Sequence, residues 1–299
     1  MKEHIRFVAA RVFLWLKTLT GYVPPETVFK HLHFVGPFTI RFPSSREVTL
    51  YSWGDRVENE LAWRGWDGHE PLERRCWAAM VESGGDILDI GANTATFALS
   101  AKCLAPASRV FAFEPVARIA EKAAQSIAAS GLDVTVVQVA VGREGGELPI
   151  HDPGGENAYS ASLDPGFLNV PKTSYKVPVT SLDEFCRQHH VYPKSIKLDV
   201  EGYEGEVIRG ATEVLARGEC VILCEWLGSP TSHMEARSIL RRSGYIGLDV
   251  FDLSEIDLSG GQEHENRNIV LIHREKVVVF RKAMMSQAER HGRAALTAS

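Results

Sequence analysis

The chain of 299 residues has a formal net charge of -5, and 44% of its residues are hydrophobic. This size and composition suit one large α/β domain with appendages, or two small domains. Acidic and basic residues are interspersed and no long basic block occurs, which argues against a nucleic-acid partner. The five cysteines form no CxxC pair, so we expect reduced, mostly buried thiols in a cytoplasmic protein.

The first 20 residues predict an amphipathic helix. Basic residues interrupt its apolar stretch, and the longest uncharged run, Val12 to Leu16, is too short to cross a bilayer. No small-residue cleavage site follows, so we expect no signal peptide. The apolar residues near one helix face are Ile5, Val8, Val12, Trp15 and Leu19. This face predicts packing on the domain, a homodimer contact or a peripheral contact with a membrane surface.

Residues 1–84 are expected to form an N-terminal extension. Alternating apolar residues predict two short strands, at Phe38–Phe42 and Glu47–Tyr51. Pro71 is typical of the first turn of a helix, which we expect to run to about Val81. The aromatic residues of the extension and of a later loop could stack on a sugar or flat ring, or could equally be core: Trp53, Trp63, Trp66 and Tyr159.

Residues 85–275 show a βαβ pattern, which predicts a mostly parallel, seven-stranded sheet with helices on both faces. The expected strands are Ile87–Ile90, Arg109–Phe113, Val134–Val139, Ser195–Leu198, Cys220–Cys224, Tyr245–Phe251 and Asn268–His273. Short strands at Glu147–Ile150 and Tyr175–Val179 should pair across a long polar loop, which is a candidate functional loop. Residues 276–299 form a C-terminal tail, which we expect to fray after Ala283.

Acidic residues follow four of the expected strands: Asp89, Glu114, Asp199 with Glu201, and Glu225. The carboxyl ends of parallel strands meet at one edge of a sheet, where ligands bind. These acids should therefore converge on one site.

A turn of small residues follows Asp89, and Thr94 is a plausible N-cap of the next helix. Such a turn exposes free backbone N–H groups and suits a nucleotide-like ligand. Glu114, at the end of the second strand, can accept hydrogen bonds from ribose hydroxyls. The G-x-G-x-x-G fingerprint of dinucleotide sites is absent, because Asn93 and Thr96 stand where glycines would be needed.

Five segments together resemble the FkbM-type family of S-adenosylmethionine-dependent methyltransferases: Asp89-Ile90-Gly91-Ala92-Asn93, Phe113-Glu114-Pro115, Ser181-Leu182-Asp183, Ile196 to Gly202, and Val207-Ile208-Arg209-Gly210-Ala211. The resemblance covers roughly Glu70 to Glu225. It implies a Rossmann-like class I methyltransferase fold with a final antiparallel strand. It also implies methyl transfer, usually to a hydroxyl of a sugar, polyketide or other secondary metabolite or glycan. One departure is Ala95, where the family commonly has glycine.

The resemblance also implies roles for residues around the cofactor. Asp89, Gly91 and Asn93 would hold its methionine part, Glu114 its ribose, and Ala140 and Val141 would lie near its adenine. The full set of expected cofactor-binding residues is Glu70, Asp89, Gly91, Ala92, Asn93, Thr94, Glu114, Pro115, Ala140 and Val141. Glu70 is equally explained as an acid at a helix N-terminus.

An alcohol is a poor nucleophile at neutral pH, so its methylation needs a base or a metal. The candidate catalytic residues are Asp199, Glu201 and Glu225. On an extended chain Asp199 and Glu201 would point the same way, and with Glu225 they could bind a divalent cation. Alternatively, Asp199 is the base alone. In a third interpretation Glu201 caps the next helix, while Asp199 packs against Lys197 or the cofactor amine.

Two other function classes stay open: a nicotinamide-dependent oxidoreductase, and a non-catalytic module with a methyltransferase-like fold. Among the histidines, His69 and His233 are the first candidates to test, although a lone histidine is more often structural. Tyr159 and Ser160 in the long loop could cover the cofactor.

Overall fold

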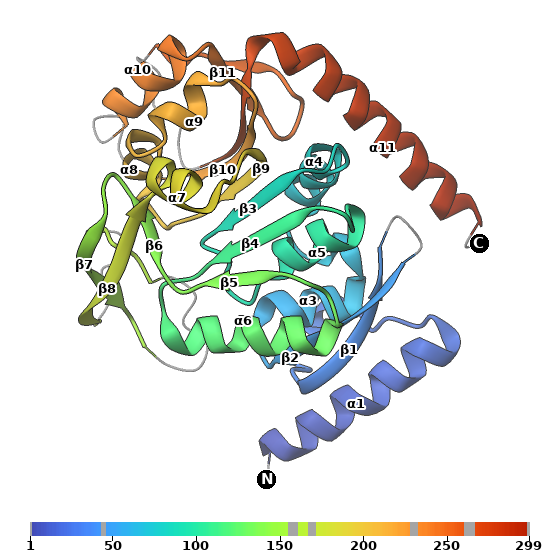
Figure 1. Cartoon of the computed structure of the whole chain (residues 1–299). Helices are drawn as coiled ribbons and strands as arrows, with labels where there is room; N and C mark the ends of the chain where they lie inside the picture. Colours follow the sequence, from blue (N-terminus) through green and yellow to red (C-terminus); the bar gives the residue numbers. More distant parts are fainter. Residues whose placement is uncertain are drawn as a thin grey trace.

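The computed structural model describes residues 2–42, 46–154, 161–166, 172–227, 233–259 and 267–297. Its largest feature is an eight-stranded sheet with the order β12-β11-β13-β10-β9-β3-β4-β5 (Figure 1). The strands are β3 (Asp86–Ile90), β4 (Arg109–Phe113), β5 (Thr135–Val137), β9 (Pro193–Leu198), β10 (Val221–Trp226), β11 (Tyr245–Asp249), β12 (Glu255–Ile256) and β13 (Arg267–His273).

The predicted fold class is confirmed. Strands β5, β4, β3, β9 and β10 run parallel, and β13 lies antiparallel between β10 and β11. The prediction of seven strands missed only β12, a two-residue strand at the edge. This order is that of the class I methyltransferase fold implied by the resemblance.

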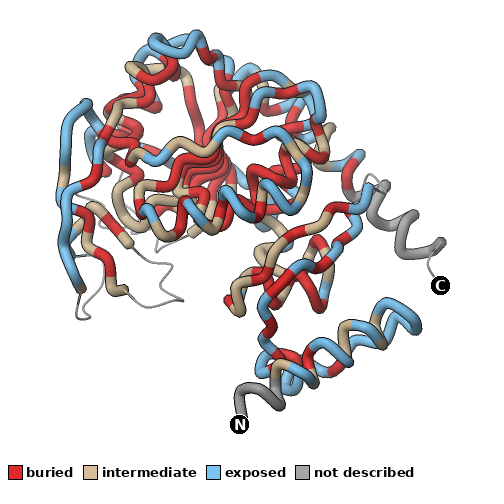
Figure 2. Tube along the Cα trace, turned by 60° about the horizontal axis from the view of Figure 1, so that its bottom comes forward, coloured by how far each residue is buried: buried red, intermediate tan, exposed pale blue. Residues whose placement is uncertain are grey.

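The two faces of the sheet bury separate clusters of apolar side chains, because successive residues of a strand point to opposite sides. In β3, Ile87 belongs to one cluster, and Leu88 and Ile90 belong to the other. Helices α4 (Pro71–Val81) and α5 (Thr96–Leu104) cover the first face. The second face is covered by α7 (Leu182–His189), α8 (Glu204–Arg209), α9 (Thr212–Ala216) and α10 (Met234–Arg242). All five residues of β3 are buried, so this strand lies at the centre of the domain (Figure 2).

The remaining core elements follow the predicted order. Helix α6 (Ala117–Ser130) connects β4 and β5, and the chain breaks at Gly210 between α8 and α9. The predicted pair of short strands is also confirmed, as β7 (Gly146–Asp152) and β8 (Thr173–Ser181). A third strand, β6 (Ala140–Gly142), pairs with β8 and was not predicted.

The N-terminal extension contains α1 (Lys2–Thr20), α2 (Glu26–Phe29), β1 (Val35–Arg41), β2 (Glu47–Trp53), α3 (Arg56–Arg64) and the 3₁₀ helix η1 (Trp66–Gly68). The predicted strands form an antiparallel hairpin. Helix α3 was missed, because its tryptophan- and glycine-rich surroundings gave no clear helical period. Trp63 and Trp66 are buried, so both belong to the core and are unavailable to a ligand.

The C-terminal segment forms a helix, α11 (Val277–Thr297), so the prediction of a frayed tail after Ala283 is wrong. Val277, Phe280 and Gln287 are buried at helical spacing, and the helix packs against α4. The charged residues of the segment masked this apolar period. Within the described part of the chain, no helix is both long and apolar enough to cross a membrane.

Candidate active site

The carboxyl ends of β3, β4, β9 and β10 border a pocket of about 340 Å³. Every residue predicted from the sequence to bind cofactor or to act in catalysis lines this pocket: Glu70, Asp89, Gly91, Ala92, Asn93, Thr94, Glu114, Pro115, Ala140, Val141, Asp199, Glu201 and Glu225. Their individual roles stay predictions. Tyr159 and Ser160, proposed to cover the site, lie outside the described residues.

The turn after β3 depends on backbone conformations that most residues avoid. Gly91, Asn93 and Ala95 all have positive φ angles, of 81°, 50° and 63°. A Cβ atom at Gly91 would lie 1.7 Å from the backbone oxygen of Asp199, so only glycine fits there. Ala95 precedes α5 in the left-handed conformation, which explains why the family commonly has glycine at this position.

The predicted N-cap, Thr94, is wrong, because α5 begins at Thr96 and follows Ala95. The hydroxyl of Thr94 instead donates a hydrogen bond of 2.5 Å to the Glu58 carboxylate on α3. Glu58 is 1% exposed, and burial raises its pKa to about 7. This contact ties the N-terminal extension to the turn. Sequence reasoning missed Glu58, because α3 itself was not predicted.

Asp89 is buried at the end of β3. Its Oδ2 atom accepts a hydrogen bond of 2.8 Å from the backbone N–H of Ala98, in the first turn of α5. Burial raises the pKa of Asp89 to about 7, despite the nearby charge of Lys197. Asp89 therefore has two roles: it lines the pocket, and it holds the first turn of α5 in place beside it.

Glu114 holds the opposite side of the turn. Its carboxylate accepts hydrogen bonds from the backbone N–H groups of Asn93 (3.1 Å) and Val116 (3.0 Å). Burial raises its pKa to about 7. The side-chain oxygen of Asn93 is buried and has no hydrogen-bond partner among the described residues. An unsatisfied buried acceptor is costly, so this oxygen suits a hydrogen-bond donor from a ligand.

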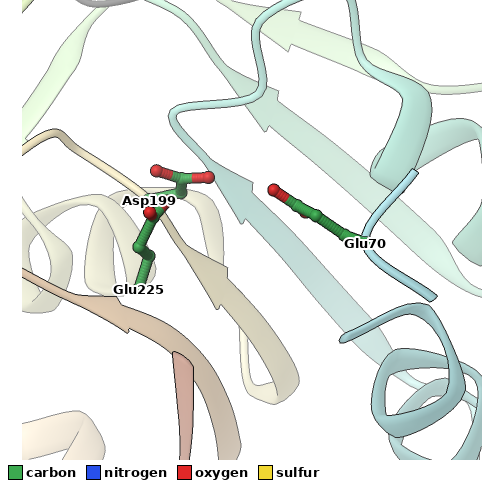
Figure 3. A group of neighbouring side chains, drawn as sticks. All are labelled: Glu70, Asp199 and Glu225. Atoms are coloured by element: carbon green, nitrogen blue, oxygen red, sulfur yellow. The ribbon is translucent and has the colours of Figure 1, made fainter. Parts of the chain in front are cut away.

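Three carboxylates from separate parts of the chain form an acid cluster: Glu70, Asp199 and Glu225. One oxygen atom of each lies within 4.8 Å of the others. Figure 3 shows Glu70 pointing at Asp199 and Glu225 from the segment before α4. As predicted, Glu70 lies directly before a helix, α4. Its backbone there has the left-handed conformation.

Glu201 is not part of this cluster, so the predicted set of metal ligands is corrected. The chain after β9 turns instead of staying extended, and Glu201 has a φ angle of 55°. It also does not cap α8, whose N-cap is Tyr203. Burial and the charge of Asp199 raise the pKa of Glu201 to about 8. Glu201 nevertheless lines the pocket.

Lys197 lies beneath the acid cluster with its side chain 2% exposed. Its Nζ atom is 2.7 Å from Asp199 Oδ2 and lies 5.1 Å from the centre of the Phe97 ring. Of the third interpretation, the contact of Asp199 with Lys197 is therefore present, and the cap by Glu201 is not. Burial lowers the pKa of Lys197, but the charges of Asp199 and Glu70 outweigh burial and raise it above its ordinary value. The ammonium group is thus a fixed positive charge in the site.

The acids of the cluster differ in protonation. Burial, together with the charge of Asp199 and a hydrogen bond to it, raises the pKa of Glu225 to about 9. Burial also acts to raise the pKa of Glu70, but a hydrogen bond from His69 and the charge of Lys197 lower it to about 2. At neutral pH Glu225 holds a proton and Glu70 is ionised.

The two predicted histidines have different positions. His69 lies at the pocket between two carboxylates, with Nδ1 2.8 Å from Glu60 and Nε2 3.5 Å from Glu70. His233 is 1% exposed, its ring centre lies 4.3 Å from that of Trp226 with the two planes tilted by 46°, and it does not line the pocket. Burial lowers the pKa of His233 to about 4, so this residue is part of the packing around β10.

The family model of the methyltransferase FkbM domain matches residues 89–246, just over half of the chain. No match was found among curated protein sequences. Methyltransferase FkbM from Methylobacillus flagellatus is 16% identical, with a TM-score of 0.38 over 63% of this chain and 43% of that chain. Precorrin-6y C5,15-methyltransferase from Geobacter metallireducens is 15% identical, with a TM-score of 0.35; the match covers 67% of this chain and 85% of that chain. A putative methyltransferase, SMU.776, complexed with SAH is 10% identical, with a TM-score of 0.39; the match covers 79% of this chain and 55% of that chain.

Proposed function

Because the chain belongs to the FkbM methyltransferase family, we propose that it transfers a methyl group from S-adenosylmethionine to a hydroxyl of a sugar, polyketide or other secondary metabolite or glycan. The acceptor class comes from the resemblance of the motifs. The observation that supports methyl transfer to a hydroxyl is the acid cluster around Asp199, which borders the pocket. Membership in this family argues against the alternative of a nicotinamide-dependent oxidoreductase.

The residues of the pocket fit this cofactor. S-adenosylmethionine is cationic at its sulfur and at its amino group, and the pocket is rich in carboxyl groups. The unpartnered oxygen of Asn93 is an acceptor for the amino group. We assign the methionine part to Asp89, Gly91 and Asn93, and the ribose to Glu114. Pro115, Ala140 and Val141 line the part of the pocket assigned to the adenine.

When bound, the cofactor supplies an electrophilic methyl group. The chain's part is to orient the acceptor and to take the hydroxyl proton. We assign the proton to Asp199, because Lys197 and Glu225 hold its carboxylate in place from two sides. Asp199 would take the hydroxyl proton as the acceptor oxygen bonds to the methyl carbon, and the carbon–sulfur bond would break with its electron pair kept by the demethylated donor.

The proton then needs a route out of the half-buried cluster. Glu70 neighbours Asp199, and His69 bridges Glu70 to Glu60. His69 can take a proton at Nε2 and release another from Nδ1. We therefore propose that Glu70, His69 and Glu60 pass the proton toward solvent.

A divalent cation is the second way to activate a hydroxyl, and the acid cluster offers three oxygen ligands. Lys197 already provides a positive charge at Asp199 Oδ2, within hydrogen-bond distance. We favour the metal-independent route for this reason. Activity that survives incubation with EDTA agrees with it, and activity restored only by added Mg²⁺ or Mn²⁺ contradicts it.

The proposal is tested by incubating the purified full chain with labelled S-adenosylmethionine and panels of saccharides, polyketides and metabolite extracts. We expect label in a product whose new methyl group is bonded to oxygen, as determined by mass spectrometry and NMR. Asp199→Asn should lose at least about 100-fold in rate, and Asp133→Asn, at an exposed site on the surface, should not. Binding of the cofactor with no methylated product in any panel would favour the non-catalytic alternative.

A further inference from the structure

Among its described side chains, helix α1 contacts the N-terminal extension through one side. Ala10 is fully buried on that side. Lys17 donates a hydrogen bond to the backbone oxygen of Ala62, and Arg11 donates one of 3.5 Å to Pro37. These contacts fix which side of the helix faces the protein.

The other side of α1 exposes an apolar stripe, formed by Val8, Val12, Trp15 and Leu19, which are 48%, 51%, 61% and 63% exposed. Their spacing of four, three and four residues aligns them along the helix. Tyr22 (52% exposed) extends the stripe beyond the helix. These residues belong to the face predicted from the sequence, and helix α1 itself lies at the periphery of the molecule (Figures 1 and 2).

The N-terminal segment that carries the stripe has a charge opposite in sign to that of the whole protein. Residues 1–25 contain Lys2, Arg6, Arg11 and Lys17 against the single acid Glu3, a formal charge of +3, whereas the whole chain has -5. The described side chains of α1 include no acid. A basic segment with an exposed apolar stripe that contains a tryptophan matches the chemistry of an anionic membrane surface.

We propose that the apolar stripe of α1 docks on a membrane surface rich in anionic lipids. A second copy of the chain fits less well, because symmetric pairing would bring two positively charged segments together. A single helical stripe is also narrower than a standard protein–protein interface, which takes about 20 to 30 residues from each partner. Val8, Val12 and Leu19 would enter the acyl boundary, and Trp15 and Tyr22 would lie at the level of the headgroups.

The test is co-sedimentation of the full chain with vesicles of phosphatidylcholine alone, and with vesicles that also contain phosphatidylglycerol. We expect binding to the anionic vesicles, at least about tenfold weaker binding to the neutral ones, and weakening by salt. The double variant Trp15→Glu/Leu19→Glu should lose binding by at least about tenfold, because it puts charge in the apolar stripe. Its thermal stability should be unchanged, since both side chains are exposed.

A matched control is Val278→Glu/Val279→Glu, which charges two equally exposed apolar residues on α11 and should leave vesicle binding unchanged. Absence of sedimentation with anionic vesicles would overturn the proposal, as would equal sedimentation of the α1 double variant. A dimer of the wild-type chain in light scattering that dissociates in the α1 double variant would assign the stripe to a second copy instead.

Discussion

Lys197 Nζ lies 2.7 Å from Asp199 Oδ2, and the lysine side chain is almost wholly buried. This pair sits at the carboxyl end of β9, where the sheet meets the pocket. It gives the acid cluster its one buried positive charge among the described residues of the pocket. The chemistry that we propose depends on this charge holding Asp199 in position.

Replacing Lys197 with methionine should therefore leave the cluster without its cation. We expect Lys197→Met to lower the free energy of unfolding by about 2–4 kcal/mol at pH 8, because breaking a buried ion pair strands the remaining charge. The loss should be smaller at pH 6, where the neighbouring carboxyl groups can take up protons. Denaturant unfolding at both pH values measures this. Lys194→Met, at an exposed ion pair on the same strand, should change stability by less than about 0.5 kcal/mol.

The raised pKa values also predict how the stability of the free protein depends on pH. Burial raises the pKa of Glu201 to about 8 and that of Glu225 to about 9, from ordinary values of 4.5. Between about pH 5 and pH 9 the folded chain therefore holds protons that the unfolded chain has lost, and the free energy of unfolding should fall as pH rises. Glu225→Gln removes one of these groups and should flatten the slope. A slope identical to wild type in that variant would contradict the assignment.

Glu58 offers a second test of burial, away from the acid cluster. Its carboxyl group, with a pKa of about 7, must lose a proton in a buried position as the pH rises to 8. We expect Glu58→Gln to match wild-type stability near pH 4, where the carboxyl group is protonated in both the folded and the unfolded chain, and to exceed it by about 1 kcal/mol or more at pH 8. Glu121→Gln, on the exposed side of α6, should behave as wild type at both pH values. Destabilisation of Glu58→Gln at pH 8 would show that the ionised form is favoured by contacts that this account omits.

The turn after β3 should tolerate no side chain at Gly91. Gly91→Ala places a Cβ atom 1.7 Å from the Asp199 backbone oxygen, so we expect a loss of roughly 3 kcal/mol or more in stability. Gly131→Ala is the matched control, because Gly131 has a similar positive φ angle but nothing within 4 Å of the added carbon. That variant should lose only about 1–2 kcal/mol, the cost of the left-handed conformation. Equal losses in the two variants would exclude the steric clash as the cause.

The central strands of the main sheet could be predicted because they are mostly buried and read as short apolar runs. The acids that follow these strands could be placed at one edge of the sheet, because the carboxyl ends of parallel strands meet there. Helix α3 could not be predicted, since its period is interrupted by polar residues that are themselves buried, such as Glu58 and Asn59. The helix after Ala283 was missed because the sequence of the C-terminal segment is rich in charged residues, which hid the apolar period.

The composition of the acid cluster was beyond sequence reasoning. Glu70 and Asp199 are far apart in the chain, and only the docking of the N-terminal extension on the sheet brings them together. Glu201 was wrongly grouped with Asp199, because nothing in the sequence shows that the chain turns directly after β9. Lys197 was named only as a possible partner of Asp199, and a charge inside a buried apolar strand is itself a signal of a partnered site.

The central claim is that this pocket binds S-adenosylmethionine, with Glu114 at its ribose. Isothermal titration of the full chain with S-adenosylmethionine tests both parts at once. We expect one site with micromolar affinity, weakened at least about tenfold (about 1.4 kcal/mol) in Glu114→Ala and unchanged in Glu121→Ala. Absence of binding to the wild-type chain would contradict the claim as a whole, and equal affinity in Glu114→Ala would contradict the placement of the ribose.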